Sequence, residues 1–337
     1  MAGGPDDAPA RKRRAESFLG IHFDFHAGKD CTEVGRDVTP AMIEDICRKV
    51  RPDYIQCDCK GHPGISSYPT KVGAPAPGFV RDPLRIWRDV TAARGVALYM
   101  HYSGVIDAEQ CRRHPEWARV GPDGTPDDGE GKRHATSVFG PYVDEVLIPQ
   151  FKELVDDYGV DGVWVDGECW GTELDYCEAA LEEFRRSTGL DAAPKGPDDP
   201  GWHEFREINR ERFRKYLAHY VDAMHDHAPG FQIASNWAYS HQMPEKVATN
   251  VDFISGDYSM QNSVNAARFA GRVMARQGRP WDLMAWSFAS RWGEKARSTK
   301  TVPQLCREAA VVLALGAGSR PTSSRNATAR YTPGRWT

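Results

Sequence analysis

The chain has 337 residues, of which 40% are hydrophobic and 27% are charged, and this composition excludes a disordered, collagen-like or coiled-coil chain as a whole. Lys and Arg number 43 against 47 Asp and Glu, so the net charge of −4 provides no basic field for a nucleic acid or an anionic membrane. No stretch approaches the roughly 20 apolar residues of a membrane span. We therefore expect a globular protein that binds neither nucleic acid nor membrane and acts on a small neutral substrate.

The N-terminal segment and the cysteines both indicate a cytoplasmic protein. Residues 1–17 carry charge but lack the apolar core of a signal peptide, so we expect a disordered N-terminal tail. Of the eight cysteines, only Cys57 and Cys59 lie close together, and in a strand they would be ~6.6 Å apart, which is poor disulfide geometry. Reduced thiols are the expected state, and the paired C-x-x-C spacing of a structural zinc site is absent.

From Phe18 onward, short apolar runs alternate with amphipathic stretches, which is typical of a parallel sheet with connecting helices. The eight expected strands are Phe18–Phe25, Tyr54–Cys59, Val96–Tyr102, Gly162–Asp166, Phe231–Asn236, Val251–Ser255, Asp282–Trp286 and Ala309–Leu315, although the last could equally end a helix. The expected helices are Pro40–Val50, Pro83–Arg94, Tyr142–Tyr158, Asp175–Thr188, Trp202–His227, Ser263–Gln277 and Val302–Ala310. Eight such units predict a (β/α)₈ TIM barrel over residues 18–318, with an open doubly wound sheet as the alternative.

The C-terminal segment does not continue this pattern. After Gly318 the sequence SRPTSSRNATARYTPGRWT has no apolar periodicity, so we expect an irregular tail over 319–337 and a barrel truncated or disrupted at its eighth helix. A shifted reading frame over Ser319–Thr328 can encode FQAYFQPERD, which is a more ordinary protein sequence. A frameshift is therefore a hypothesis, and resequencing the gene would test it.

In a barrel the residues just after each strand carry the chemistry. These positions hold carboxylates, histidines and indoles, a composition that suits a sugar ring with polar hydroxyls and apolar C–H faces. The candidates for substrate binding are His26, Lys60, His62, His101, Tyr102, Trp170, Asn236, Trp237 and Trp286.

Three carboxylates are candidates for catalysis. Asp166 ends a fully apolar strand, where an ionised group needs a partner or a function. Asp257, near the end of the sixth strand, is the candidate acid/base, because glycosidases need two carboxyl groups facing each other across the scissile bond; it could equally be a turn-forming residue. Glu168 is the alternative acid/base, although we expect an exposed loop position for it.

A metal site on the first strand is the competing interpretation. His22, Asp24 and His26 would point to one side of a regular strand, as in metal-dependent barrel hydrolases. His22 and His26 would, however, be ~13 Å apart and could not share one ion. We therefore expect no metal or other cofactor, and His26 to bind a substrate hydroxyl or to serve a structural role.

Several segments together resemble the α-L-fucosidase family of retaining glycoside hydrolases. CDCKGHPGISSYPTK is similar to that family's K-H-H-D-G-F…P-S-K motif, with Gly61 in place of the first histidine, and RDPLRIWRDVTAARGVALYMHYS is similar to its helix and G-L-Y-Y-S strand. LGIHFDFHAG is similar to a pattern ending in H-W-G, and YVDEVLIPQFKELVDDYGVDGVWVDGECW to the segment that carries the nucleophile. SSYPTKVG and RRHPEW also resemble segments of a barrel family described as hypothetical glycosyl hydrolases.

The resemblance implies a TIM barrel that cleaves a terminal sugar by double displacement, with Asp166 as nucleophile and His26 at the sugar. The expected substrate is an oligosaccharide or glycoside of the fucoside or galactoside kind, no cofactor is implied, and a homo-oligomer stays open. Two other functions also stay open: a non-catalytic carbohydrate-binding barrel, which would bind sugar without turnover, and a metal-dependent barrel hydrolase, which would lose activity on chelation.

Overall fold

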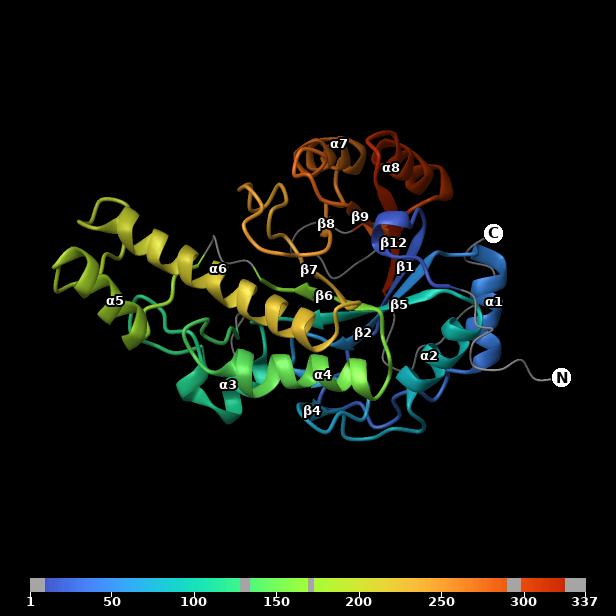
Figure 1. The fold of residues 1–337 in the computed structure, drawn as a ribbon, viewed down its shortest axis with the longest axis horizontal. Coiled ribbons are helices and arrows are strands. Elements are labelled where there is room, and N and C mark those ends of the chain that lie inside the picture. Colours follow the sequence, from blue (N-terminus) through green and yellow to red (C-terminus); the bar gives the residue numbers. More distant parts are fainter. Residues whose placement is uncertain (1–9, 128–133, 169–172, 290–297, 325–337) are drawn as a thin grey trace.

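The computed structural model describes residues 10–127, 134–168, 173–289 and 298–324, and these form a parallel barrel ringed by helices (Figure 1). The sheet order is β7-β6-β5-β2-β1-β12-β9-β8, and every neighbouring pair in that order is parallel. The strands are β1 (Gly20–Asp24), β2 (Tyr54–Lys60), β5 (Ala97–Ser103), β6 (Gly162–Asp166), β7 (Gln232–Ser235), β8 (Ile254–Asp257), β9 (Trp281–Trp286) and β12 (Gly318–Ser324).

The barrel is nearly closed, with a seam between its first and last strands in that order. An isolated parallel bridge joins Asn236 to Ser255, and the Asp252 amide donates to the Ile233 carbonyl. A continuous ladder does not form between β7 and β8 in the part of the chain that the structure describes. The short strands β3 (Ile65–Ser66) and β4 (Ala74–Pro75) extend one edge of β2, and β10 (Phe288–Ala289) pairs with β11 (Ser298–Thr299).

Helices follow the strands and cover the outside of the barrel (Figure 1). Two of them begin with a capping residue followed by proline: Thr39 accepts from the Met42 amide at the start of α1, and Asp82 accepts from the Arg85 amide at the start of α2. No helix of the described residues is long and apolar enough to cross a membrane. The helices are α1 (Pro40–Val50), α2 (Pro83–Ala93), α3 (Ala108–Arg113), α4 (Ile148–Asp156), α5 (Glu178–Thr188), α6 (Trp202–His227), α7 (Ser263–Met274) and α8 (Val302–Ala314).

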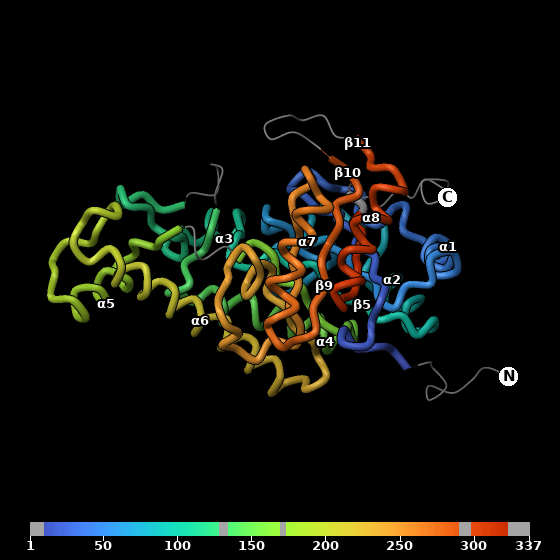
Figure 2. Tube along the Cα trace, turned by 90° about the horizontal axis from the view of Figure 1, so that it is seen from above, coloured from blue at the N-terminus to red at the C-terminus, as the bar shows by residue number. Residues whose placement is uncertain are grey.

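Helix α5 and the first half of α6 extend away from the barrel (Figures 1 and 2). They carry a small apolar cluster of their own, built on Ala180, Phe184 and Phe205. The second half of α6 returns to the barrel, where Tyr216 and Tyr220 belong to the main core. This extension lies between β6 and β7 in the sequence, so it begins beyond the carboxyl end of β6, beside the mouth of the barrel.

Side chains alternate between the two faces of each strand, which divides the core into two parts. Inward residues such as Tyr54, Tyr99 and Trp164 pack inside the barrel. Outward residues such as Leu98 and Met100 pack against the helices in the larger core. The same alternation determines which polar residues at the strand ends face the mouth.

The first seven expected strands are confirmed with shifts of a few residues, whereas the eighth is wrong. Ala309–Leu315 is the end of α8 and the turn after it, and the eighth strand is β12, in a segment for which we expected irregular chain. A short apolar run fits a buried helix as well as a strand. The β12 sequence hides its role because Pro321 argues against a central strand and its inward Arg320 is charged.

The N-terminal segment also differs from the expectation of a disordered tail. Residues 10–17 are described, and a 3₁₀ turn at Arg14–Glu16 places the buried Arg14 guanidinium at the amino-terminal end of the barrel. Arg14 stacks on the ring of Tyr54, with the guanidinium carbon 3.6 Å from the ring centre, and pairs with Asp282 at 2.5 Å. Residues 10–17 contact the barrel because the Arg14 guanidinium is compensated by Asp282 and packs on Tyr54.

Candidate active site

Inward-facing side chains at the carboxyl ends of the strands form the barrel mouth. They continue the interior rows, for example from Tyr99 to His101 in β5 and from Trp164 to Asp166 in β6. The mouth residues in the described chain are Asp24, Asp58, His101, Asp166, Asn236, Asp257 and Trp286. Sequence reasoning missed Asp58 as a member of this set, although its alternation with Tyr54 and Gln56 along β2 was a usable signal.

Asp166 is held as an ionised carboxylate. Its Oδ2 lies 3.1 Å from His101 Nε2, and its Oδ1 accepts from Asn236 Nδ2 at 2.7 Å and from the Gly167 amide at 2.8 Å. Burial acts to raise the pKa of Asp166, but the hydrogen bond from His101 and the nearby histidine charges outweigh it and hold that pKa far below its ordinary value. An ionised, fixed carboxylate is what a nucleophile requires.

His101 joins two carboxylates. It is 2% exposed, and its Nδ1 lies 2.9 Å from Asp58 Oδ1 while its Nε2 faces Asp166. Burial acts to lower the pKa of His101, but the hydrogen bonds to Asp166 and Asp58 outweigh it and raise the pKa to about 10. The imidazole is therefore protonated on both nitrogens when both carboxylates contact it and nothing else binds them.

Asp257 has the opposite environment. Its Oδ1 accepts from Trp237 Nε1 at 2.6 Å, and burial together with the negative charge of Asp166 raises its pKa. Trp237 has a φ of +72°, a left-handed conformation that a non-glycine residue rarely adopts, and the loop is held there with its indole directed at Asp257. The pKa values of two carboxyl groups at one barrel mouth are thus shifted in opposite directions.

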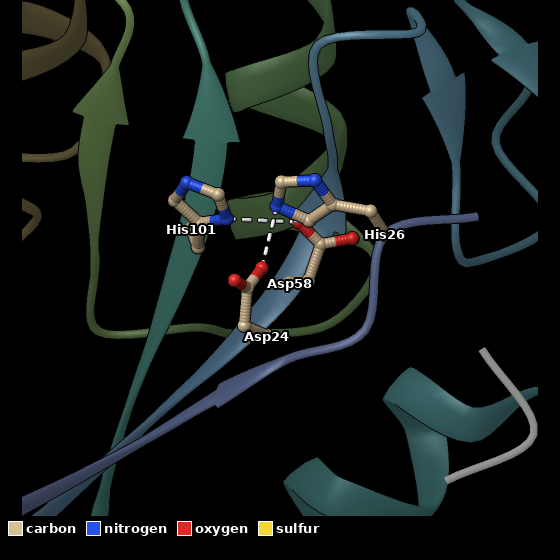
Figure 3. Close-up of side chains that lie close together, drawn as sticks. All are labelled: Asp24, His26, Asp58 and His101. Carbon is tan, nitrogen blue, oxygen red and sulfur yellow. Dashed lines mark hydrogen bonds and ion pairs between the residues drawn. The ribbon is translucent and has the colours of Figure 1, made fainter. Parts of the chain in front are cut away.

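Two further histidines line the mouth beside Asp166. His26 Nε2 lies 2.5 Å from Asp24 Oδ1 and 3.4 Å from Asp58 Oδ1, as Figure 3 shows for the first of these contacts. His62 donates to or accepts from Ser103 Oγ at 2.6 Å through Nδ1, and its Nε2 is 3.7 Å from Asp166. Both rings are partly exposed and available to a ligand.

Glu168 is a buried residue, not the exposed loop residue that we expected. Its side chain accepts hydrogen bonds from Tyr220 of α6 at 2.9 Å and from Ser235 at 2.5 Å. Both partners belong to the layer between the barrel and α6, because Ser235 is the outward neighbour of the inward Asn236. Burial raises the pKa of Glu168 to about 7, so it is a proton-holding carboxyl outside the mouth.

Solved structures with this architecture cover nearly the whole chain, although no protein-family model and no curated protein matches it. Alpha-L-fucosidase isoenzyme 2 from Paenibacillus thiaminolyticus superimposes with a TM-score of 0.74 at 19% identity, over 94% of this chain and 47% of its own. A beta-galactosidase from Rahnella sp. R3 gives 0.64 at 16% identity, over 94% and 51%. An alpha-L-fucosidase of family GH29 from Bacteroides thetaiotaomicron gives 0.57 at 13%, over 99% and 73%.

This chain has their barrel fold. The expected fucosidase-like TIM barrel is thereby confirmed as a fold, and the open doubly wound sheet is excluded. The chain spans about half the length of the Paenibacillus and Rahnella enzymes.

Within this barrel two expected substrate-binding residues face away from the mouth. Tyr102 follows His101 in the strand, so it points outward, where its hydroxyl donates to Gln150 at 2.7 Å. Lys60 is 1% exposed and pairs with Asp107 at 2.7 Å. The register of β2 against β5 shifts between Asp58 and Lys60, and this bulge turns Lys60 to the outer face beside Tyr102.

The aromatic candidates divide in the same way. Trp286 is partly buried at the end of β9 against the inner core, and Trp237 lies beside Asp257, so both border the mouth. Trp170 lies outside the described residues. The structure thus brings together His26, His62, His101, Asn236, Trp237 and Trp286 with Asp166 and Asp257, and separates Lys60, Tyr102 and Glu168 from them.

Proposed function

We propose that the chain is a retaining glycoside hydrolase that removes a terminal sugar by double displacement. The observation that carries the proposal is the pair of carboxylates at the barrel mouth with opposite pKa shifts, Asp166 lowered and Asp257 raised. The fold supports it, because the similar solved structures are fucosidases and a galactosidase.

In this mechanism Asp166 attacks the anomeric carbon while Asp257 protonates the departing glycosidic oxygen. The covalent glycosyl–Asp166 ester is then hydrolysed by water, from which Asp257 removes a proton. Asn236 and the Gly167 amide fix the Oδ1 of Asp166, which leaves its orientation set before substrate binds. Trp237 holds Asp257 in place through its indole N–H.

The sugar would lie over His26 and His62, whose partly exposed rings offer hydrogen bonds to hydroxyls, with Trp286 as a face for the apolar side of the ring. We propose fucosides and galactosides as the first substrates. Glu168 is less suited to the acid/base role than Asp257, because its carboxyl is enclosed between the barrel and α6.

The test is hydrolysis of a panel of aryl glycosides, led by α-L-fucosides and galactosides, with Asp166→Asn as the first variant. Turnover by the wild type and its loss in Asp166→Asn support the proposal. Unchanged turnover in that variant would contradict it, and sugar binding without turnover across the panel would identify a carbohydrate-binding barrel instead.

A second experiment assigns the acid/base and the stereochemistry. Asp257→Ala should lower turnover by roughly 10²–10⁴-fold, and azide, which needs no general base, should restore it on substrates with activated leaving groups. Nuclear magnetic resonance of the first-formed sugar should show the anomer of the substrate. An inverted product would rule out double displacement.

A further inference from the structure

Four side chains at the mouth converge on one point. Asp24, His26, Asp58 and His101, which we call the His₂Asp₂ cluster, each offer one ligand atom, and these atoms lie within 4.8 Å of one another. Figure 3 shows the two imidazoles facing the two carboxylates from three adjacent strands or strand ends. Asp58 and His101 are register partners between β2 and β5, and Asp24 follows Phe23, the register partner of Cys57.

The donor set has a clear chemical preference. Two imidazole nitrogens and two carboxylate oxygens are ligands of zinc and of the neighbouring divalent transition metals, whereas calcium and magnesium prefer oxygen alone. Around a tetrahedral ion with bonds of about 2.0–2.2 Å, such donor atoms lie roughly 3–3.6 Å apart. The observed spacing needs only small side-chain rotations, and His26, with a side chain 32% exposed, has room for one.

The surroundings of the cluster match those of metal ligands. Ligand histidines in metal sites hold their second nitrogen against a carboxylate or carbonyl, and ligand carboxylates are themselves hydrogen-bonded. His101 presents Nδ1 to the cluster and has Nε2 fixed on Asp166 at 3.1 Å. Asp58 presents Oδ1 to the cluster and has Oδ2 held by Ser67 Oγ at 2.9 Å.

The charges of the His₂Asp₂ cluster and the hydrogen bonding of its atoms also favour a bound cation. Asp24 Oδ1 and His26 Nε2 are shielded from solvent, yet neither makes a hydrogen bond of good geometry to a described residue despite their 2.5 Å separation. Asp24 and Asp58 bring two negative charges to the cluster, and Asp166 adds a third behind His101. A divalent cation that replaces the imidazole protons would balance these carboxylates and give Asp24 Oδ1 and His26 Nε2 one shared partner of suitable geometry.

We propose that Asp24, His26, Asp58 and His101 bind one divalent transition-metal ion, zinc in the first instance. This reverses our expectation from the sequence, which compared His22 with His26 and found them too far apart. His22 lies outside the cluster, where its Nδ1 is 3.1 Å from Gln56 Nε2. The second histidine of the cluster is His101 of β5. The ion would take the place of the proton on His101 Nδ1 and leave Nε2–H donating to Asp166.

The test is metal content and affinity of the full chain. The protein is stripped with a chelator, dialysed, loaded with zinc chloride and analysed by mass spectrometry for bound zinc and by calorimetry for affinity. We expect one zinc per chain in the wild type and at least tenfold weaker binding in His101→Gln and in Asp58→Asn. Cobalt(II) should bind with visible absorption bands that those variants lack.

Two further variants keep the test decisive. His26→Gln alters a partly exposed ligand at the mouth and covers the case in which a buried substitution prevents folding. His219→Ala removes a surface histidine 2.7 Å from Asp144, a His–Asp pair outside the cluster, and should retain the zinc.

No zinc in the wild type would overturn the proposal. Equal zinc in the wild type and His26→Gln would also overturn it, because the ion would then be adventitious. The measurement does not depend on turnover, so a chain that binds zinc and hydrolyses no glycoside would refute only the proposed function.

Discussion

Three carboxyl groups at or near the mouth differ in the direction or size of their pKa shifts, and the reason is their immediate contacts. Asp166 receives hydrogen bonds from His101, Asn236 and a backbone amide, which stabilise its charge. Asp257 accepts a hydrogen bond from the Trp237 indole and lies near the negative charge of Asp166. Glu168 accepts hydrogen bonds from Tyr220 and Ser235, and Tyr216 is close to it. In the mechanism that we propose, the same functional group would thus serve as a charged nucleophile in Asp166 and as a proton donor in Asp257, whereas in Glu168 it is a buried acid.

Asn236→Ala tests how much the fixed orientation of Asp166 contributes to catalysis. The variant removes the 2.7 Å hydrogen bond and leaves Oδ1 of the carboxylate held by the Gly167 amide alone. We expect kcat to fall by roughly 10–100-fold, with KM changed much less, because the contact orients the nucleophile and does not bind the sugar. Steady-state kinetics measure this, and Asn265→Ala, at an exposed position of α7, is the control. A rise in KM at constant kcat would instead mark Asn236 as a substrate ligand.

Glu168→Gln tests the buried acid through the pH dependence of stability. The native state keeps the Glu168 proton up to a pKa of about 7, while the unfolded chain releases it near 4.3, so stability falls as pH rises between these values. The loss is at most about 4 kcal/mol and is complete about one pH unit above 7. The titratable groups that face the Glu168 carboxyl are Tyr216, Tyr220 and Asp166.

We therefore expect Glu168→Gln to gain stability relative to the wild type from pH 5 to pH 8. Denaturant unfolding at several pH values measures it, and Glu182→Gln, at an exposed position of α5, controls for the loss of one charge. A difference between wild type and Glu168→Gln that stays constant with pH would disprove the assignment of this proton.

At the scale of elements, the strand ends and helix starts position the mouth. Asp82 illustrates this, because one oxygen caps α2 through the Arg85 amide and the other accepts from Tyr158, just after α4, at 2.9 Å. The cap therefore couples two helices that lie outside β2, β5 and β6. The bulge in β2 also shapes the mouth. It turns the Lys60 side chain to the outer face of the barrel, while the Asp58 side chain stays at the mouth.

Asp82→Ala should lower the free energy of unfolding by about 1–2 kcal/mol, because it removes a helix cap and leaves the Tyr158 hydroxyl without its acceptor. Asp82→Asn keeps an oxygen for the cap and should lose less. Urea unfolding of both variants checks the order. Equal losses would show that charge, and not the cap, is responsible.

The whole molecule is a barrel with one cluster of charged residues at its base and another at its mouth. At the base, Arg14 from the N-terminal segment and Arg320 from β12 approach Asp282 of β9, so residues more than 260 positions apart share one buried site. At the mouth, the His₂Asp₂ cluster lies beside Asp166 and Asp257, and below it are the rings of Trp164 and His22.

Arg14→Met should destabilise the fold by about 3 kcal/mol, because it removes the cation closest to the buried Asp282 and leaves Arg320, at 3.9 Å, to compensate that charge, with hydrogen bonds from Ser255 and Tyr54. Arg13→Met is the matched control, since the side chain of Arg13 is half exposed, and we expect a change within about 0.5 kcal/mol. Denaturant unfolding measures both. A similar loss in the free energy of unfolding of the two variants would mean that the buried Arg14–Asp282 pair does not stabilise the barrel.

The sequence by itself determined the features that depend on local interactions. Apolar runs predicted seven of the strands, Thr39-Pro40 and Asp82-Pro83 set helix starts, and Asp166 was recognisable as a carboxylate at the end of an apolar strand. Each of these signals lies within a few residues of the position it describes.

Only the tertiary structure decided which polar residues meet. The bulge that turns Lys60 outward, the alternation that buries Glu168 under α6, and the register that sets Asp58 beside His101 depend on neighbouring strands. Arg14 and β12 were missed for the same reason, because a charged residue enters a barrel only when a distant partner such as Asp282 compensates it. Pairing across the barrel is non-local, and no stretch of sequence taken alone contains it.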